Sequence, residues 1–176
     1  VTNMSSMFEY ASGFDQDISN WNVSKVSDMA LMFNGVTDFN QPIGSWDVSN
    51  VTLMNGMFGY AISFNQDLSN WDVALVLGMN SMFFNATAFN QDISTWCVTN
   101  ITEEPVNFSI GSSLEENNKP DWGFCNFVKL TTYKATNITF TSAVVSGEII
   151  TAPETVTERG ILYALESISL KTCQIK

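Results

Sequence analysis

Apolar side chains recur along this chain with a period of 25 residues. Methionine and tryptophan mark the start and the end of each copy, in two aligned sets: Met4, Met29, Met54 and Met79, and then Trp21, Trp46, Trp71 and Trp96. A fixed period of 20–50 residues is typical of repeat proteins, in which every unit buries its apolar face against its neighbours. The pattern therefore predicts a repeat solenoid of four coils over residues 1–100.

Two local patterns inside the unit predict its elements. Met54, Met57 and Phe58 are spaced i, i+3 and i+4, which places them on one face of a short helix. Further on, Trp71 and Val73 alternate with polar residues, as in a short strand. We therefore expect one short parallel strand and one short helix in each 25-residue coil, with the strands of adjacent coils about 4.8 Å apart.

Beyond the fourth unit the pattern decays. Phe108 stays in register, but Glu104 and Asn107 stand at the two methionine positions and Pro105 lies between them. A solenoid needs an atypical terminal unit that shields its last apolar face. Residues 101–125 are therefore predicted to be the C-terminal cap of the solenoid.

The cysteines predict a staple between the last coil and this cap. If Trp96 and Val98 point inward, Cys97 points outward, and Cys125 ends the cap. We expect a Cys97–Cys125 disulfide, which persists in oxidising surroundings. Cys173 is then the odd thiol, and three scattered cysteines do not suit a zinc site.

The composition changes completely from residue 126. Methionine and tryptophan disappear, threonine, valine and isoleucine dominate, and three strand-like runs follow at 128–136, 142–150 and 158–165. Three strands do not close a sandwich core. Residues 126–176 are therefore predicted to be an incomplete β-sandwich module.

Charge and composition exclude several partners. The net charge is −11, and residues 1–100 hold nine acids and one lysine, which argues against nucleic acid and anionic membrane surfaces. No 18-residue apolar run is present, so we expect no membrane insertion. The absence of histidine removes the usual general base. Val1 stands where Val26 and Val51 stand in later units, so we expect a piece of a longer protein.

Two rows of outward polar residues on the predicted strands are the candidate binding surface. They are Asn20, Ser45, Asn70 and Thr95, and then Asn22, Asp47 and Asp72. A flat, acidic surface of hydrogen-bonding groups suits a protein or glycan partner. The alternative is that both rows are simply solvated.

A second column, of aspartates, raises the question of a metal. Asp17, Asp67 and Asp92 share one unit position, and Pro42 interrupts them. We interpret them as solvated corner residues that cap turns, and a structural calcium ion that bridges them is the alternative. The methionines are interpreted as core rather than as a copper site. No cofactor is otherwise predicted.

An enzyme is the least favoured interpretation. Asp47 and Asp72 lie on neighbouring predicted strands and are the candidate carboxylate pair for action on a polysaccharide. Nothing in the sequence builds a cleft around them. We therefore predict that the chain is not an enzyme.

The unit itself carries a resemblance to a known family. It reads Met-Phe, followed by Phe-Asn-Gln-Asp-Ile-Ser-x-Trp-x-Val. This resembles the 25/26-residue repeat of BspA-like bacterial surface proteins, relatives of leucine-rich repeats in the domain-of-unknown-function 285 group. The cap, with Glu104-Pro105, Asn118-Lys119-Pro120 and Trp122-Gly123, is similar to the end of such arrays in Bacteroidetes. The segment with Ser146-Gly147 and Glu158-Arg159-Gly160 resembles the fibronectin-type-III-like modules that often follow.

The resemblance implies a function in interaction. It implies a leucine-rich-repeat-like solenoid in a secreted or cell-surface protein, exported by the type IX secretion route. The expected activity is adhesion through a protein or glycan at the cell surface. The alternative is a structural spacer or filament subunit of a larger surface protein, whose partners are other modules of the same assembly.

Overall fold

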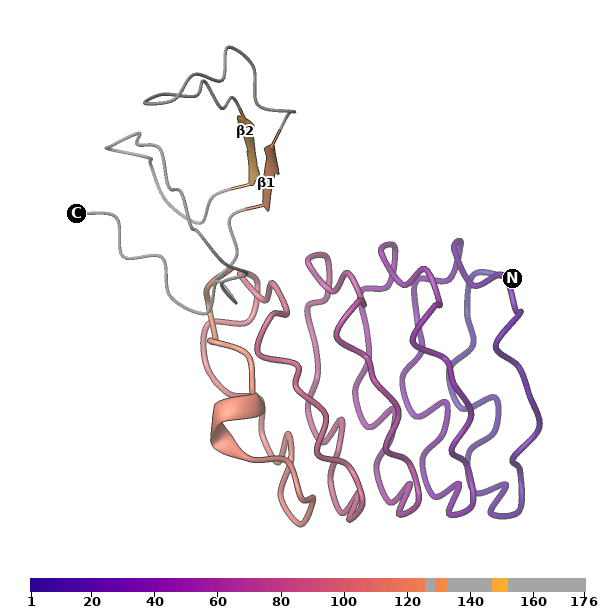
Figure 1. Cartoon of the computed structure of the whole chain (residues 1–176). Helices are drawn as coiled ribbons and strands as arrows, with labels where there is room; N and C mark the ends of the chain where they lie inside the picture. Colours follow the sequence, from indigo (N-terminus) through magenta and orange to yellow (C-terminus); the bar gives the residue numbers. More distant parts are fainter. Residues whose placement is uncertain (126–128, 133–146, 152–176) are drawn as a thin grey trace, which may run out of the picture. The chain divides into compact units, whose positions relative to one another are not determined.

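The computed structural model describes residues 1–125, 129–132 and 147–151. The chain separates into two compact units, Val1–Asn126 and Phe127–Lys176. The first unit is a stack of coils, one for each 25-residue repeat, seen side by side in indigo to pink in Figure 1. Within residues 1–125 its one regular element is the 3-10 helix η1, Glu116–Asn118. The second unit contains the strands β1, Lys129–Thr132, and β2, Gly147–Thr151.

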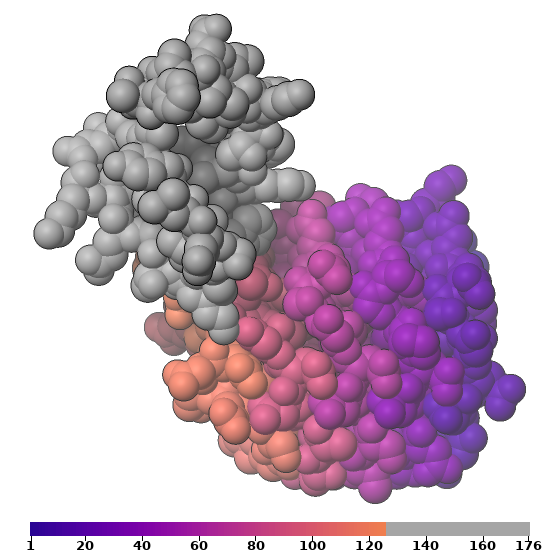
Figure 2. All heavy atoms as spheres, viewed as in Figure 1, coloured from indigo at the N-terminus to yellow at the C-terminus, as the bar shows by residue number. Residues whose placement is uncertain are grey.

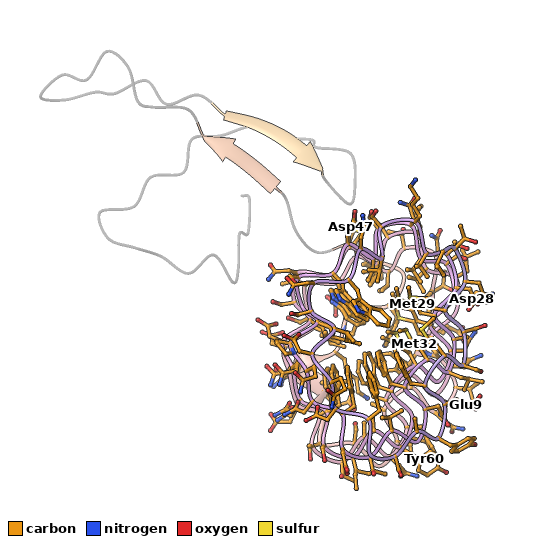
Figure 3. The ribbon with its side chains drawn as sticks, turned by 90° about the vertical axis from the view of Figure 1, so that its right-hand side faces the viewer. Glu9, Asp28, Met29, Met32, Asp47 and Tyr60 are labelled. Carbon is orange, nitrogen blue, oxygen red and sulfur yellow. A yellow bond between two sulfur atoms is a disulfide. The ribbon has the colours of Figure 1, made fainter. Side chains whose placement is uncertain are left out.

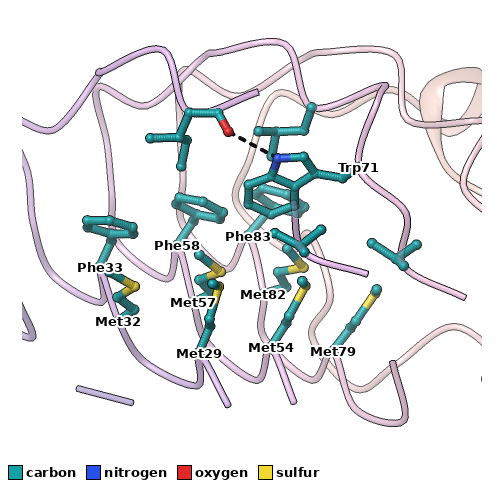
Figure 4. Close-up of a cluster of buried hydrophobic side chains, with 14 of the residues drawn as sticks. Met29, Met32, Phe33, Met54, Met57, Phe58, Trp71, Met79, Met82 and Phe83 are labelled. Atoms are coloured by element: carbon teal, nitrogen blue, oxygen red, sulfur yellow. Dashed lines mark hydrogen bonds between the residues drawn. The ribbon is translucent and has the colours of Figure 1, made fainter. Parts of the chain in front are cut away.

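We number the positions of the repeat so that the first methionine of every unit stands at position 4. The interior of the stack is filled mainly from positions 1, 4, 7, 8, 14, 18, 21 and 23. The predicted burial of Met57 and Phe58 is confirmed, since both side chains are fully buried. In Figure 4 the phenylalanines Phe33, Phe58 and Phe83 form one column, and the methionines form further columns beside it. Adjacent rings in this column are 5.7 Å and 5.6 Å apart. Each coil therefore buries its apolar residues on the next coil.

The tryptophans at position 21 add a polar link to this core. The rings of Trp71 and Trp96 stack at 6.4 Å with an interplanar angle of 6°. The indole Nε1 of Trp46 donates to the carbonyl of Ile18, and that of Trp96 donates to the carbonyl of Leu68. Each indole thus satisfies a carbonyl of the preceding coil. Trp21, at the open end of the first coil, is 40% exposed.

The short helix expected at positions 4–8 does not form. In the first coil the N–H of Met7 donates to the carbonyl of Met4, which closes a turn. The N–H groups of Ser6 and Phe8 instead donate to the carbonyls of Ala30 and Met32 in the next coil. A helix this short is marginal by itself, and cross-coil bonds satisfy the same donors. The apolar spacing i, i+3, i+4 is therefore produced here by turns.

A repeated backbone conformation makes this arrangement possible. Positions 6 and 10 have positive φ in all four coils, including 55° at Ser6, 60° at Tyr10 and 61° at Gly56. Residues in this left-handed conformation interrupt a right-handed helix. As a result, alternate peptide N–H groups point toward the next coil, and the carbonyls that accept them point back. The wall at positions 3–10 is a ladder of peptide groups with one common direction.

The short parallel strand expected around each tryptophan is also absent. Around Trp71 the backbone makes tight turns, in which the N–H of Trp71 donates to the carbonyl of Leu68 and the N–H of Val76 donates to that of Val73. Parallel pairing occurs instead at position 3, as isolated bridges that connect Asn3, Asp28, Leu53 and Gly78. The alternation of apolar and polar residues therefore predicts correctly which side chains are buried, but its prediction of a strand is wrong.

The cap at residues 101–125 stacks on the fourth coil with a shift of one residue. Between coils, the N–H of Phe58 donates to the carbonyl of Met82, whereas the N–H of Phe83 donates to that of Phe108. Phe108 thus takes the place of a position-7 methionine, and the expectation that it keeps the phenylalanine register is wrong. The left-handed conformation moves with this shift, to Asn107 and Gly111.

Covalent and ionic contacts hold the cap. Cys97 and Cys125 form the expected disulfide. Lys119 Nζ lies 2.9 Å from Glu104 and 2.6 Å from Glu116. Partial burial disfavours the charged form of Lys119, but its hydrogen bonds to the two carboxylates outweigh this effect and raise the pKa of the amine.

In the second unit, β1 pairs with β2 in antiparallel register, with Leu130 opposite Ile149 and a bulge at Lys129/Leu130. The third predicted run, 158–165, and Cys173 lie outside the described residues. No helix in the part of the chain that is described is long and apolar enough to cross a membrane.

Candidate functional site

The two polar rows predicted as the binding surface do face solvent. All four residues of the position-20 row and all three of the position-22 row are exposed. The position-22 row also has a structural task, because Asp47 Oδ1 accepts bonds from the N–H and hydroxyl of Ser49, and Asp72 Oδ1 accepts one from the N–H of Ala74. Asn22 makes the same turn with Ser24. These side chains cap turns at the corner of each coil.

The same hydrogen bonds favour the charged form of Asp47. The hydroxyl and then the N–H of Ser49 stabilise the carboxylate and hold the pKa of Asp47 below its ordinary value. A carboxyl group that stays ionised cannot act as the general acid of glycoside hydrolysis. A shallow hollow lies at the cap and is lined by Glu104 and Lys119 among others. The lowered pKa of Asp47 thus favours its role as a turn cap over that of a general acid.

The aspartate column at position 17 is built in the same way. Asp17, Asp67 and Asp92 each accept a bond from the N–H of the serine two residues later. The side chain and then the N–H of Ser19 lower the pKa of Asp17, and the N–H and then the side chain of Ser69 lower that of Asp67. Within residues 1–125 and the two described strands, no group of three or more acidic, cysteine or histidine side chains is arranged to hold a metal ion. The column therefore caps turns.

The structure presents a further surface that the sequence reading did not single out. Residues at positions 3, 5, 9 and 10 point outward from the ladder of aligned peptides, on a different side of the coil from Asp47, as Figure 3 shows for Asp28, Glu9 and Tyr60. Tyr10 is 73% exposed and Tyr60 48% exposed. The available signal was a tyrosine at position 10 of alternate units.

Glycines make this wall smooth. The ring of Tyr10 lies over Gly35, where an added Cβ would approach Tyr10 Cδ1 to 2.6 Å. The side chain of Leu31 covers Gly56 in the same way, and that of Asn55 covers Gly78. Each large side chain thus lies across the backbone of the next coil, and glycine leaves room for it.

The charge of the wall changes along the stack. Glu9 and Asp28 carry charge in the first and second coils, whereas residues 53–60 and 78–85 contain no ionisable acid or base other than the Tyr60 phenol. We call the outward residues of the third and fourth coils the neutral wall, defined as Leu53, Asn55, Tyr60, Asn80 and Phe84. In the orientation of Figure 2 this wall lies on the far side, and the coloured atoms of the facing side form a continuous surface. The neutral wall is thus an uncharged surface on a strongly acidic protein.

Comparison with known proteins gives one family. The family described as "Mycoplasma protein of unknown function, DUF285" matches residues 2–122, which includes all four coils and nearly all of the cap. No curated protein and no solved structure matches the chain significantly.

Proposed function

The chain belongs to the DUF285 family, and from that premise we propose that it is a non-enzymatic protein of the cell surface or extracellular space that mediates adhesion. Its partner is a protein or glycan, which it binds through the outside of the coil stack. The proposed fold is a leucine-rich-repeat-like solenoid. BspA-like ancestry, a fibronectin-type-III-like second module and type IX export from Bacteroidetes belong to the same proposal.

The observation that carries the proposal is the division of each coil into a closed interior and a repeated exterior. Met57, Phe58 and Trp71 are buried with their equivalents in the second and fourth coils, and buried side-chain polar atoms of the described residues all have partners. The exterior repeats polar and aromatic groups with the spacing of the coils. Repeat proteins use such extended surfaces for binding.

Two further observations support the location and the second module. The Cys97–Cys125 disulfide is typical of oxidising compartments outside the cytosol. The antiparallel pair of β1 and β2 is the kind of element from which β-sandwich modules are built.

The test is a binding screen with the intact, oxidised chain. The labelled protein is applied to an array of neutral, sialylated and sulfated glycans and to a panel of purified extracellular-matrix proteins. Saturable binding that disappears when the protein is unfolded in urea supports adhesion. Absence of saturable binding on both panels contradicts it.

A structural spacer is the second candidate, and the continuous ring columns favour it. Phe33, Phe58 and Phe83 stack in nearly parallel planes, with interplanar angles of 9° and 5°. Close packing of this kind resists bending of the stack. Small-angle scattering of longer arrays tests this role. A cross-sectional profile of a stiff rod, combined with no ligand, supports the spacer, and a flexible chain profile contradicts it.

A further inference from the structure

We propose that the neutral wall binds a neutral oligosaccharide. The inference rests on the proposed function and assigns it a site and a ligand class. The site consists of one aromatic pair, two side-chain amides and one leucine at positions 3–10 of the third and fourth coils, where the polar rows at positions 20 and 22 do not reach.

The aromatic pair supplies a stacking surface. Tyr60 and Phe84 lie on adjacent coils with ring centroids 5.3 Å apart and an interplanar angle of 79°. This edge-to-face contact holds the exposed Tyr60 ring in place, so less conformational entropy is lost when a ligand packs on it. The C–H face of a pyranose ring packs on such a ring, while its hydroxyls remain available for hydrogen bonds.

The two amides supply donors for those hydroxyls. Asn55 Oδ1 accepts a bond from the N–H of Asn80 at 3.0 Å, and Asn80 Oδ1 accepts one from the N–H of Val106 at 3.0 Å. These bonds fix both amides with their oxygens turned to the backbone. Each Nδ2 group has no protein acceptor among the described residues, and an amide NH₂ carries two donors. Two oriented donors therefore lie on the same wall as the ring pair.

Charge selects the ligand class. The chain carries −11 overall, so its field repels sialylated, sulfated and phosphorylated ligands. A cationic ligand has no carboxylate to pair with at residues 53–60 or 78–85. A neutral ligand with many hydroxyl groups is not repelled by the net charge and does not need a carboxylate partner.

Periodicity favours a glycan over a protein. The third and fourth coils each present an amide and a ring on the wall, Asn55 with Tyr60 and Asn80 with Phe84. A linear oligosaccharide likewise presents hydroxyls and an apolar face on every sugar. A protein interface depends on a few large anchors in an apolar centre, whereas here side-chain amides and covered glycine backbone lie beside a single pair of rings.

The experiment uses the intact, oxidised chain and substitutions borrowed from other coils. Neutral hexose and N-acetylhexosamine oligosaccharides are screened beside sialylated and sulfated ones, and the best neutral ligand is titrated by calorimetry. Tyr60→Asn introduces the residue found at Asn85, and Asn80→Ala introduces that found at Ala30, so each suits its backbone. We expect binding of neutral glycans only, weakened by about tenfold or more in each variant, as expected for loss of one stacking or hydrogen-bonding group worth 1.4 kcal/mol or more.

Matched controls lie on the other surface. Asn70→Ser and Asp47→Asn, borrowed from Ser45 and Asn22, test the polar rows instead, and affinity that is lost in these two variants but kept in Tyr60→Asn overturns the inference. Thermal unfolding should show that all variants fold. Binding confined to charged glycans, or unchanged in Tyr60→Asn, overturns the inference. Leu77 is an exposed apolar side chain at position 2 of the fourth coil, where the third coil has Thr52. Binding of a matrix protein that is lost in Leu77→Thr, with no glycan bound, overturns the glycan site but leaves the adhesive function. Failure of both panels overturns both.

Discussion

The indole Nε1 of Trp71 donates a hydrogen bond of 3.1 Å to the main-chain carbonyl of Ile43 in the preceding coil. This bond is the dashed line in Figure 4, beside the column of phenylalanine rings. The bond joins two coils inside the apolar core. The Trp71 side chain therefore both fills the core and satisfies a buried carbonyl.

Trp71→Phe should therefore destabilise the stack by more than the loss of side-chain volume alone would. The carbonyl of Ile43 loses its donor, and an unsatisfied buried acceptor costs about 1–3 kcal/mol. Urea unfolding followed by circular dichroism measures the change. Trp21→Phe is the control, because Trp21 is already 40% exposed and should cost much less. Equal costs at both positions would contradict the role of the hydrogen bond.

Phe58→Ala should be among the most damaging substitutions in the chain. Its ring is fully buried and stacks on Phe64 at 4.1 Å as well as on its neighbours along the column. Loss of a buried phenylalanine costs roughly 3–5 kcal/mol through lost burial and the cavity left behind. The free energy of unfolding of the variant gives the answer, with the half-buried Phe8 of the first coil as the comparison. A change within error would show that the interior repacks freely.

Gly44→Ala should destabilise the turn at which it lies. A Cβ at this residue would collide with the main-chain oxygen of Asp67 in the next coil, which cannot rotate away as a side chain could. Overpacking of this kind costs about 1–3 kcal/mol. Gly13→Ala is a matched control, since its nearest neighbour would be Asp38 Oδ2 at 4.0 Å. The difference in thermal midpoint between the two variants measures the clash, and no difference would contradict it.

Acid should weaken the turns at position 17. The N–H and hydroxyl of Ser69 lower the pKa of Asp67 from its ordinary 3.8. A depressed pKa in the folded state contributes stability that is present above 3.8 and is lost as the pH falls through the lower folded value. Asp67→Asn keeps the acceptor but does not titrate, so its thermal midpoint should fall less between pH 6 and about pH 2. Parallel curves for both proteins would exclude this contribution.

Removal of the Cys97–Cys125 disulfide should loosen the cap first. The bond joins residues 28 apart in sequence, for which loop entropy gives about 3–4 kcal/mol. Cys97→Ser with Cys125→Ser should lower the unfolding free energy and make residues 101–125 sensitive to limited proteolysis. Cys173→Ser leaves the bridge intact and is the control. Resistance of the cap in the double variant would show that packing alone holds it.

The sequence alone determined which side chains lie inside the coil stack. Met57, Phe58 and Trp71 repeat at an interval of 25, and water excludes apolar groups wherever the backbone brings them together. Burial of these residues follows from their order in the chain. The same reasoning located the outward Cys97 and its partner Cys125.

Only the tertiary structure decided the path of the backbone between those side chains. The N–H of Phe8 has two potential acceptors, one in a local helix and one at Met32 in the next coil, and Met-x-x-Met-Phe suits both. The stack supplies the second acceptor, and a short helix gains too little to compete with it. The left-handed residues, such as Tyr60, turn the side chains of the wall outward. Which side chains form the neutral wall therefore depends on this path of the backbone. The shift at Phe108 likewise needed the fourth coil, because register is set by the partner and not by the segment alone.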